Sequence, residues 1–153
     1  MNVERIFISP GHNFFGHHDQ PAGQAPILEV EEIECVAGRG IRGDRFFDHK
    51  PDYKGQITFF SLEVYAEMCF ELGLRGDRLS ALRRNVVVSG DDLGLFIGRE
   101  FKVQGLRFLG TEESRPCHWM NGAVVGGAEE WLRGRGGLRA KILAGGILQK
   151  GMG

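Results

Sequence analysis

Several features that would each assign a protein to a particular class are missing from this sequence. The first ten residues have no basic start followed by an apolar run, as a secretory signal would, and no later apolar run approaches the roughly 20 residues needed to cross a membrane. The three cysteines, Cys35, Cys69 and Cys117, form no CxxC pair. This excludes a zinc ribbon and favours free thiols over a disulfide framework. We therefore expect a cytoplasmic protein with no membrane segment.

The chain also lacks a net charge of any size. Its formal net charge is −1, which provides no overall field to attract nucleic acid or an anionic membrane, so any anion binding has to be local. Arginine suits such a role because its guanidinium group grips phosphate through two parallel hydrogen bonds. The sequence contains two arginine clusters, Arg75, Arg78, Arg83 and Arg84, and Arg133, Arg135 and Arg139. For either cluster alone, a solvated basic surface is an equally good interpretation.

Length and composition predict one globular domain over residues 1–153. Charged residues make up 25% and apolar residues 42% of the chain, which is an ordinary globular balance. The sequence contains 24 glycines, about twice the usual share. Together with many short strand patterns and one clear helix, this favours a mainly β (α+β) fold. We expect a closed or strongly curved β-barrel with one main helix and a few short helices.

The first half of the chain shows three strand patterns and the main helix. Residues 3–8 predict a strand, and residues 27–36 predict another whose apolar parity changes at Glu31-Glu32, which indicates a β-bulge. Residues 56–60 predict a buried strand, after which Ser61 is a good N-cap for a helix closed by Gly73. The predicted apolar stripe of this helix consists of Leu62, Tyr65, Ala66, Cys69 and Leu72.

The second half predicts further short strands. The triple valine at 86–88 indicates a strand covered on both faces. Residues 101–103 and 106–109 predict a hairpin that leads the chain toward Cys117. A short helix at 128–133 is followed by a strand at 138–142, whose even positions are apolar and odd positions basic. That alternation predicts one wet face.

The most reactive candidate lies in residues 113–120. Cys117 follows Pro116, which fixes the backbone, and it is flanked by Arg115 and His118, cations that stabilise a thiolate. The thiolate is the nucleophilic and metal-binding form, so Cys117 is a candidate nucleophile, sulfur carrier or soft metal ligand. The alternative is a small hydrophobic side chain in the core, because free cysteines are among the most buried residues.

Two other stretches carry candidate anion-binding groups. Arg83, Arg84 and Asn85 precede the triple valine, so two guanidinium groups and an amide can converge at a strand entrance. Residues 38–45 form a glycine-rich turn with GxGxxG spacing, which no predicted helix follows, so it is a weak dinucleotide fingerprint. Asp44 in this turn would accept hydrogen bonds from backbone amides or orient an arginine toward a ligand.

The loop at residues 11–26 holds several potential metal ligands. His12, His17, His18 and Asp19, with His49 as a further ligand, would make a zinc or iron site. Histidines in a loop are alternatively hydrogen-bonding surface groups. The metal hypothesis predicts stoichiometric metal that is lost on His17→Ala.

Five short motifs occur in order along residues 27–151. They are Gly40-Ile41-Arg42-Gly43-Asp44-Arg45, Arg83-Arg84-Asn85-Val86-Val87, Asp92-Leu93 followed by Gly98 and Phe101, Pro116-Cys117, and Gly136-Gly137-Leu138-Arg139-Ala140 with Gly145-Gly146-Ile147. Together they resemble the MOSC domain, the module at the C-terminus of molybdenum cofactor sulfurases. The resemblance implies a β-barrel-rich domain, binding of a molybdopterin-type molybdenum cofactor, and a cysteine that carries sulfur or ligates molybdenum.

Individual positions follow from this resemblance. Cys117 matches the family's Pro-Cys cysteine, Arg84 and Asn85 match its strand entrance, and Gly43-Asp44 matches its Gly-Asp turn. The family pattern ends in Gly-Asp, where this chain has Gly151-Met152. The implied metal ligand is Cys117. The implied cofactor-binding residues are Arg83, Arg84, Asn85, Asp44, Arg45, Arg115, His118, Gly136 and Gly137.

Two classes of function remain open besides the loop metal site. In the first, a stand-alone MOSC module uses Cys117 as a molybdenum ligand and reduces N-hydroxylated small compounds, or it relays sulfur from a cysteine desulfurase partner. Electrons would come from a separate donor protein, because the sequence shows no flavin or nicotinamide motif. In the second, the module binds an anion or a partner without catalysis and Cys117 is structural. We expect no pyridoxal phosphate, because the desulfurase domain of full sulfurases has no counterpart in this sequence.

Overall fold

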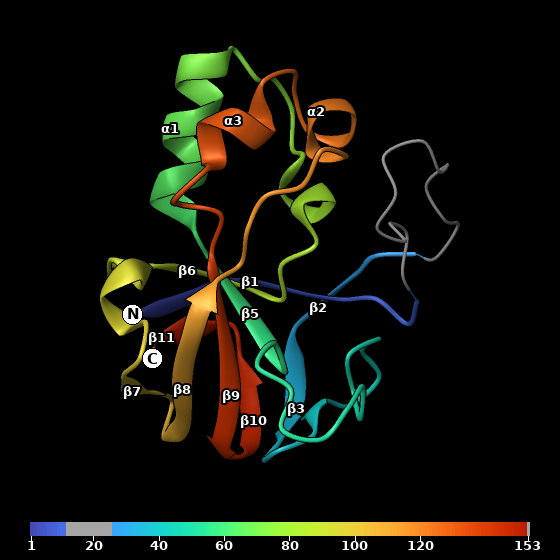
Figure 1. Cartoon of the computed structure of the whole chain (residues 1–153), viewed down its shortest axis with the longest axis vertical. Coiled ribbons are helices and arrows are strands. Elements are labelled where there is room, and N and C mark those ends of the chain that lie inside the picture. The colour runs from blue at the N-terminus through green and yellow to red at the C-terminus, as the bar shows by residue number, and fades with distance from the viewer. Residues whose placement is uncertain (12–25, 153) are drawn as a thin grey trace.

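The computed structural model describes residues 1–11 and 26–152, in which two β-sheets lie below a layer of helices (Figure 1). The helical elements are α1 (Leu62–Leu72), η1 (Leu79–Leu82), η2 (Leu93–Phe96), α2 (Met120–Ala123) and α3 (Ala128–Leu132). The strands are β1 (Asn2–Ile8), β2 (Leu28–Val30), β3 (Glu32–Val36), β4 (Gly40–Ile41), β5 (Ile57–Ser61), β6 (Val86–Ser89), β7 (Glu100–Val103), β8 (Leu106–Glu113), β9 (Leu138–Ala144), β10 (Gly146–Gln149) and β11 (Gly151–Met152).

The larger sheet is mixed and open. Its strand order is β11-β1-β6-β5-β9-β8-β7, with β2 pairing a second stretch of β1, and a separate three-stranded sheet has the order β10-β3-β4. The β5–β6 pair is parallel, with α1 in the connection, and the other pairs are antiparallel. The mainly β class with a few helices is confirmed. The expectation of a closed or strongly curved barrel is wrong, because the path ends at β7 instead of returning to its first strand.

The physical reason for this error lies in where the glycines are used. The barrel was inferred from the glycine content, on the assumption that glycines bend strands. Of the described glycines, 13 have positive φ, and most of these 13 lie at turns and helix ends. Gly73, for example, caps α1 with φ 66°, and Gly105, with φ 82°, turns β7 into β8. Glycine richness therefore reflects tight connections between short strands.

Two hydrophobic clusters share the central strands. The first fills the space between the two sheets, and the second lies between the larger sheet and the helices. Val86 and Val88 of β6 belong to the first cluster, whereas Val87 points into the second. Since successive strand residues face opposite sides, the triple valine buries both faces, as the sequence predicts.

Helix α1 begins and ends where the sequence predicts. The Ser61 hydroxyl accepts a hydrogen bond from the amide of Val64, and the Gly73 amide donates to Cys69 O. The predicted apolar stripe is only partly correct. Met68 is the fully buried residue of the helix, Ala66 is exposed, and Cys69 is half-buried. The stripe is therefore rotated toward Met68.

The segment at residues 27–36 is not one bulged strand. It divides into β2, which pairs with β1, and β3, which pairs with β10 in the other sheet. The parity change at Glu31-Glu32 thus marks a bend that moves the chain between sheets. Ile33 and Cys35 of β3 face the first cluster, where burial raises the pKa of the Cys35 thiol to about 12. Cys35 is a structural thiol.

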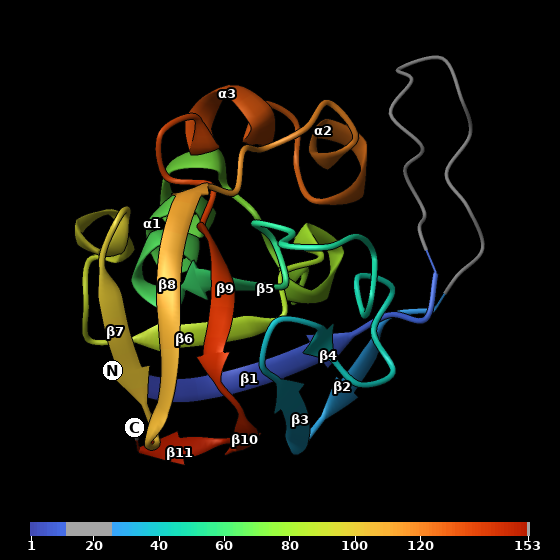
Figure 2. The same ribbon diagram turned by 60° about the horizontal axis from the view of Figure 1, so that its bottom comes forward.

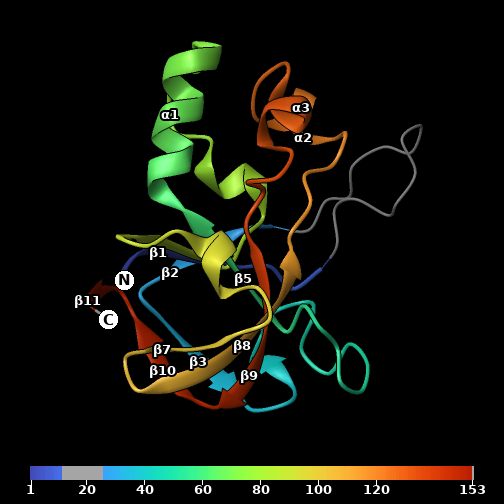
Figure 3. The same ribbon diagram turned by 60° about the vertical axis from the view of Figure 1, so that its left-hand side comes forward.

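The two ends of the described chain meet. Asn2 and Val3 of β1 pair with Met152 and Gly151 of β11, and the N- and C-terminal ends lie side by side in Figures 2 and 3. Among the described residues, none of the helices has the length and apolar character needed to cross a membrane.

Candidate functional site

A pocket of about 430 Å³ opens where β5, β8 and β9 approach the segment after β4. We call it the basic pocket, because five arginines line it against two glutamates, Glu112 and Glu113. The arginines come from distant parts of the chain and bring together both clusters seen in the sequence. They are Arg45, Arg83, Arg84, Arg115 and Arg139.

Arg84 is a clamp between three segments. Its Nε donates to Gly136 O at 2.9 Å and its Nη1 donates to Leu82 O at 2.9 Å. Its Nη2 donates to Ser114 O at 2.9 Å and to Arg115 O at 3.2 Å. The guanidinium therefore ties the start of β6 to the segment that leads into Cys117 and to the turn before β9.

Arg83 and Arg45 are held in a second network. Arg83 Nη2 donates to Ser9 Oγ at 2.9 Å and to Gly11 O at 2.7 Å. Arg45 Nη2 donates to Arg83 O at 3.2 Å, and its Nη1 lies 3.3 Å from Asp44 Oδ1. The buried Asp44 carboxylate also accepts from the amide of Ser9 at 2.9 Å. Asp44 thus accepts from backbone amides, the first of the two alternatives expected for it, and it lies beside Arg45. The second alternative, that it orients an arginine toward a ligand, stays a prediction.

Asn85 lies beneath the pocket instead of facing it. Its Oδ1 accepts from the amide and hydroxyl of Thr58, and its Nδ2 donates to Phe7 O at 3.2 Å. The side chain is buried, and it joins β1 and β5 at the start of β6. These contacts give Asn85 a structural position, and its contact with a cofactor stays a prediction.

Arg139 and Tyr53 form another wall. The Arg139 guanidinium donates to Glu112 Oε1 at 2.7 Å and to the Tyr53 hydroxyl, and it lies over the Tyr53 ring at 5.2 Å. A Cβ on Gly55 would stand 2.7 Å from Arg139 Nε. Only glycine therefore leaves room for this guanidinium.

Burial and mutual repulsion shape the electrostatics of the basic pocket. Burial lowers the pKa of Arg84 to about 10, helped by the charges of Arg45 and Arg139 and opposed by Cys117 and Glu113. Burial and the Arg45 charge likewise lower the pKa of Arg83 to about 10. Both groups stay protonated at neutral pH. An anion in the pocket would offset the repulsion that the Arg45 charge exerts on both groups.

Gly136 and Gly137 let three backbone segments approach one another. A Cβ on Gly136 would lie 2.4 Å from Ser114 O and 2.8 Å from Pro116 Cδ, and a Cβ on Gly137 would lie 2.6 Å from Phe59 O. Glu113 Oε2 accepts from the amides of Gly134 and Gly136 at 2.9 and 3.1 Å. The turn before β9 is therefore fixed against the segment that carries Cys117.

Cys117 adjoins the basic pocket but does not line it. It is half-buried and packs against the second hydrophobic cluster, and the pocket lining reaches only to Arg115. The interaction between Arg84 and Cys117 nevertheless places the sulfur near a buried cation. His118 is exposed, with Nδ1 3.9 Å from Glu129 Oε1, and does not line the pocket.

The loop metal site cannot be placed. His12, His17, His18 and Asp19 lie outside the described residues, so that hypothesis stays a prediction. His49 is described, and its ring packs on Phe46 and Tyr53 with centroid distances of 5.3 and 4.7 Å. Within residues 1–11 and 26–152, no group of three or more His, Cys, Asp or Glu side chains could hold a metal ion.

Sequence reasoning missed some of the pocket walls. Tyr53 lies in an irregular stretch with no periodic signal. Glu112 lies beyond the predicted hairpin, which was ended at residue 109, whereas β8 continues to Glu113. The observed register pairs Glu112 of β8 with Arg139 of β9, a contact between strands that no local pattern links.

The comparisons with known proteins agree with this fold and these motifs. A family model described as the MOSC domain matches residues 42–151. The chain belongs to the MOSC domain family. The order of motifs in the sequence had indicated this, so the resemblance is confirmed. Comparison with curated proteins gave no match.

Two solved structures are similar to this MOSC domain in fold. The YuaD protein from Bacillus subtilis aligns with a TM-score of 0.71 and 19% identity, over 98% of this chain and 91% of YuaD. YiiM from Escherichia coli aligns with a TM-score of 0.60 and 15% identity, over 95% of this chain and 65% of YiiM. At these identities the likeness shows a shared fold alone.

Proposed function

We propose that this MOSC domain binds a molybdopterin-type molybdenum cofactor in the basic pocket, with Cys117 as the sulfur that ligates the metal or carries sulfur to it. One observation carries the proposal. Five arginines converge on one pocket, and one of them, Arg84, also adjoins Cys117. Anion binding and thiolate chemistry are therefore supported at neighbouring points of the same site.

The residues present suit such a group. The pocket volume of about 430 Å³ lies in the range of small-molecule sites. Its five arginines suit a phosphate, and the rings of Phe46 and Tyr53 in its lining suit a flat heterocycle. The cofactor, when bound, supplies a metal centre that exchanges two electrons.

The arginines divide between scaffold and ligand contact. The Arg84 guanidinium donates its hydrogen bonds to backbone carbonyls, so its role is to hold the Cys117 segment in place. Arg115 is exposed at the rim and donates no side-chain hydrogen bond within the described part of the chain. Its five N–H donors are therefore available to an incoming anion, and we assign it the most direct phosphate contact.

Cys117 supplies the chemistry expected of a soft ligand. Arg84 interacts electrostatically with this sulfur. A cysteine thiolate can bind molybdenum or accept a sulfur atom as a persulfide. Its half-buried position against the helices keeps one side of the sulfur away from solvent.

The test is molybdenum content and oxidised-pterin fluorescence on protein purified without oxygen from a host that makes the cofactor. We expect both in the wild type and a several-fold loss of pterin in Arg115→Ala. The matched control is Arg107→Ala, which removes an exposed arginine of β8 that pairs with Glu100 outside the pocket. Pterin loss in both variants, or in neither, would contradict the assignment.

Cys117→Ser separates the two roles of the sulfur. Loss of molybdenum with pterin retained identifies a metal ligand. If molybdenum is retained, sulfur released by cyanide after treatment with a cysteine desulfurase and cysteine, in the wild type but not in the variant, identifies a carrier. If the variant keeps its molybdenum and the wild type accepts no sulfur, Cys117 is structural and its proposed role is wrong.

A further inference from the structure

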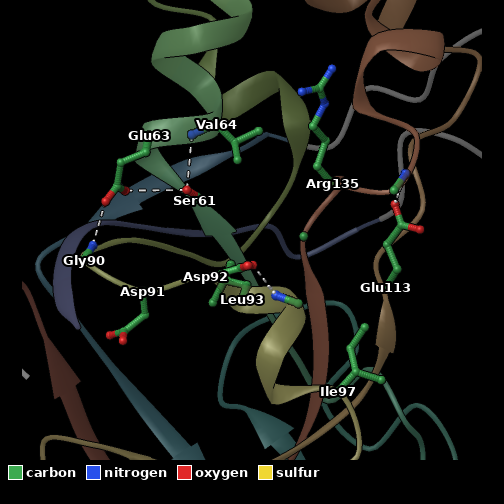
Figure 4. Close-up of a pocket in the computed structure, with 13 residues that line it drawn as sticks. Ser61, Glu63, Val64, Gly90, Asp91, Asp92, Leu93, Ile97, Glu113 and Arg135 are labelled. Atoms are coloured by element: carbon green, nitrogen blue, oxygen red, sulfur yellow. Dashed lines mark hydrogen bonds between the residues drawn. The ribbon is translucent and has the colours of Figure 1, made fainter.

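A second pocket lies beside the same strand ends, and its character is opposite. It has a volume of about 490 Å³ and is formed by the start of α1, the loop from Gly90 to Ile97, and the ends of β8 and β9 (Figure 4). We call it the acidic pocket. Glu113 lines both this pocket and the basic pocket.

The walls of the acidic pocket are partly apolar. Val64 lies in α1, Leu93 lies in η2, and Ile97 is the residue that follows η2. Ile97 is 45% exposed, so part of this aliphatic side chain is in contact with water. A ligand with an apolar body would remove this surface from water.

Three carboxylates line the pocket without a cationic partner. Glu63 Oε2 accepts from the Gly90 amide at 2.7 Å, Asp92 Oδ1 accepts from the Gly94 amide at 3.0 Å, and Glu113 accepts from two amides. Within residues 1–11 and 26–152, none of the three has a lysine or arginine within ion-pair distance. By contrast, Asp91 at the rim pairs with the N-terminal amino group at 3.0 Å.

The one arginine in the lining is committed elsewhere. The Arg135 guanidinium lies over the Trp131 ring at 3.5 Å, and its Nε donates to Trp131 O at 2.7 Å. Trp131 in turn donates to Glu71. In Figure 4 the Arg135 side chain points away from Asp92 and Leu93. Arg135 keeps its positive charge, and Glu113 also faces the Arg84 charge of the basic pocket, so the negative charge is offset only in part, and none of the three carboxylates forms an ion pair within the described chain.

We propose that the acidic pocket binds a small organic cation, an apolar body that carries a protonated amine or amidinium group. The apolar walls would cover the body, and the carboxylates would face its charge. The volume lies in the range of small-molecule sites and exceeds what one inserted side chain fills. The site is separate from Cys117 and does not depend on the cofactor proposed for the basic pocket.

The test uses benzamidine as the cationic probe and benzamide as its neutral isostere. Benzamidine titrated into the protein labelled with 15N and with 13C methyl groups should give saturable shifts at Val64, Leu93 and Ile97. Benzamide should give none at equal concentration. Saturable shifts that map to another surface, or equal binding of benzamide, would overturn the proposal.

Charge-neutralising variants locate the contact. Asp92→Asn and Glu63→Gln keep side-chain oxygens that can accept from Gly94 and Gly90 while removing one charge each. Each should weaken benzamidine binding by roughly two- to fivefold, the effect of a partly exposed ion pair. The matched control is Glu67→Gln, which removes the same charge one turn along α1 and does not line the pocket.

The control separates a site from a general field. If Glu67→Gln weakens binding as much as Glu63→Gln, the probe responds only to diffuse negative charge and the proposal fails. If Asp92→Asn and Glu63→Gln leave the affinity unchanged while their 15N spectra show a native fold, it fails as well. A negative result here would not affect the cofactor proposal, whose readouts are metal and pterin.

Discussion

The two pockets beside the ends of β8 and β9 differ in how their charges are held. In the basic pocket, the side chains of Arg84, Arg45 and Arg139 donate to protein oxygens that fix their positions. In the acidic pocket, Glu63, Asp92 and Glu113 accept only from amides and a hydroxyl. Positive charge is thus held by hydrogen bonds to the scaffold on one side, whereas on the other side the carboxylates of Glu63 and Asp92 form no ion pair within the described residues.

This difference distinguishes residues that stabilise the fold from residues whose charges are available to a ligand. An arginine that satisfies several carbonyls cannot be removed without loss of stability, whatever it binds. A carboxylate that forms no ion pair contributes little to stability through its charge. The same argument picks out Arg115 in the basic pocket, since its exposed side chain has no such structural contacts in the described chain. Charge neutralisation should therefore have opposite consequences on the two sides.

The largest expected effect is on the scaffold of the basic pocket. Arg84→Ala should lower the free energy of unfolding by about 3 kcal/mol or more, because carbonyls of three segments lose a charged donor. Urea unfolding followed by circular dichroism measures this. The control Arg107→Ala should change stability by less than about 0.5 kcal/mol. Equal midpoints for Arg84→Ala and the wild type would break the distinction drawn here.

A smaller effect is expected at the turn between the pockets. Gly136→Ala should cost about 2 kcal/mol, because its Cβ meets Ser114 O and Pro116 and the backbone has to move. Gly126→Ala is the matched control, since nothing lies within 4 Å of a Cβ there. The same urea unfolding assay compares them. Similar stabilities for the two variants would show that the turn is not held by close packing.

The smallest effect compares one carboxylate from each pocket. Arg139 lowers the pKa of Glu112 through a side-chain hydrogen bond. A lowered folded-state pKa gives stability that is present above the unfolded pKa of about 4.3 and is lost as pH falls through the folded value. Glu112→Gln should therefore cost roughly 0.5 kcal/mol at pH 7, limited by solvent screening, and progressively less as the pH falls below the unfolded pKa.

Asp92→Asn supplies the other half of that comparison. Asparagine caps a helix as well as aspartate does, so its unfolding free energy at pH 7 should stay within about 0.5 kcal/mol of the wild type. Unfolding curves at pH 7 and pH 3 measure both variants. A cost for Asp92→Asn that exceeds that of Glu112→Gln would reverse the comparison and give Asp92 a structural role.

Much of the secondary structure follows from local signals. The cap at Ser61, the stop at Gly73 and the valines of β6 act through neighbours in sequence, and each was predicted correctly. Sheet closure could not be predicted this way. Whether β7 pairs with a distant strand depends on contacts between remote segments, and a glycine count does not report them.

The sequence indicated which residue types would form the candidate site better than it indicated the contacts that each residue makes. The arginines of the basic pocket were recognised from clustering and from the family motifs. Their contacts were not, because Arg84 donates to carbonyls about 30 and 52 positions away in the chain. The acidic pocket gave no signal, since Glu63, Asp92 and Glu113 belong to three segments that each look like ordinary polar surface.

The sequence by itself determined the MOSC family, the main helix and the hairpin, because these depend on residue type, periodicity and short spacings. Only the tertiary structure decided that the sheet is open, that Arg84 is a clamp, that Cys117 adjoins the basic pocket without lining it, and that three carboxylates share an apolar hollow. These features arise when segments far apart in the chain are packed together, and no local pattern encodes which of their polar atoms will meet.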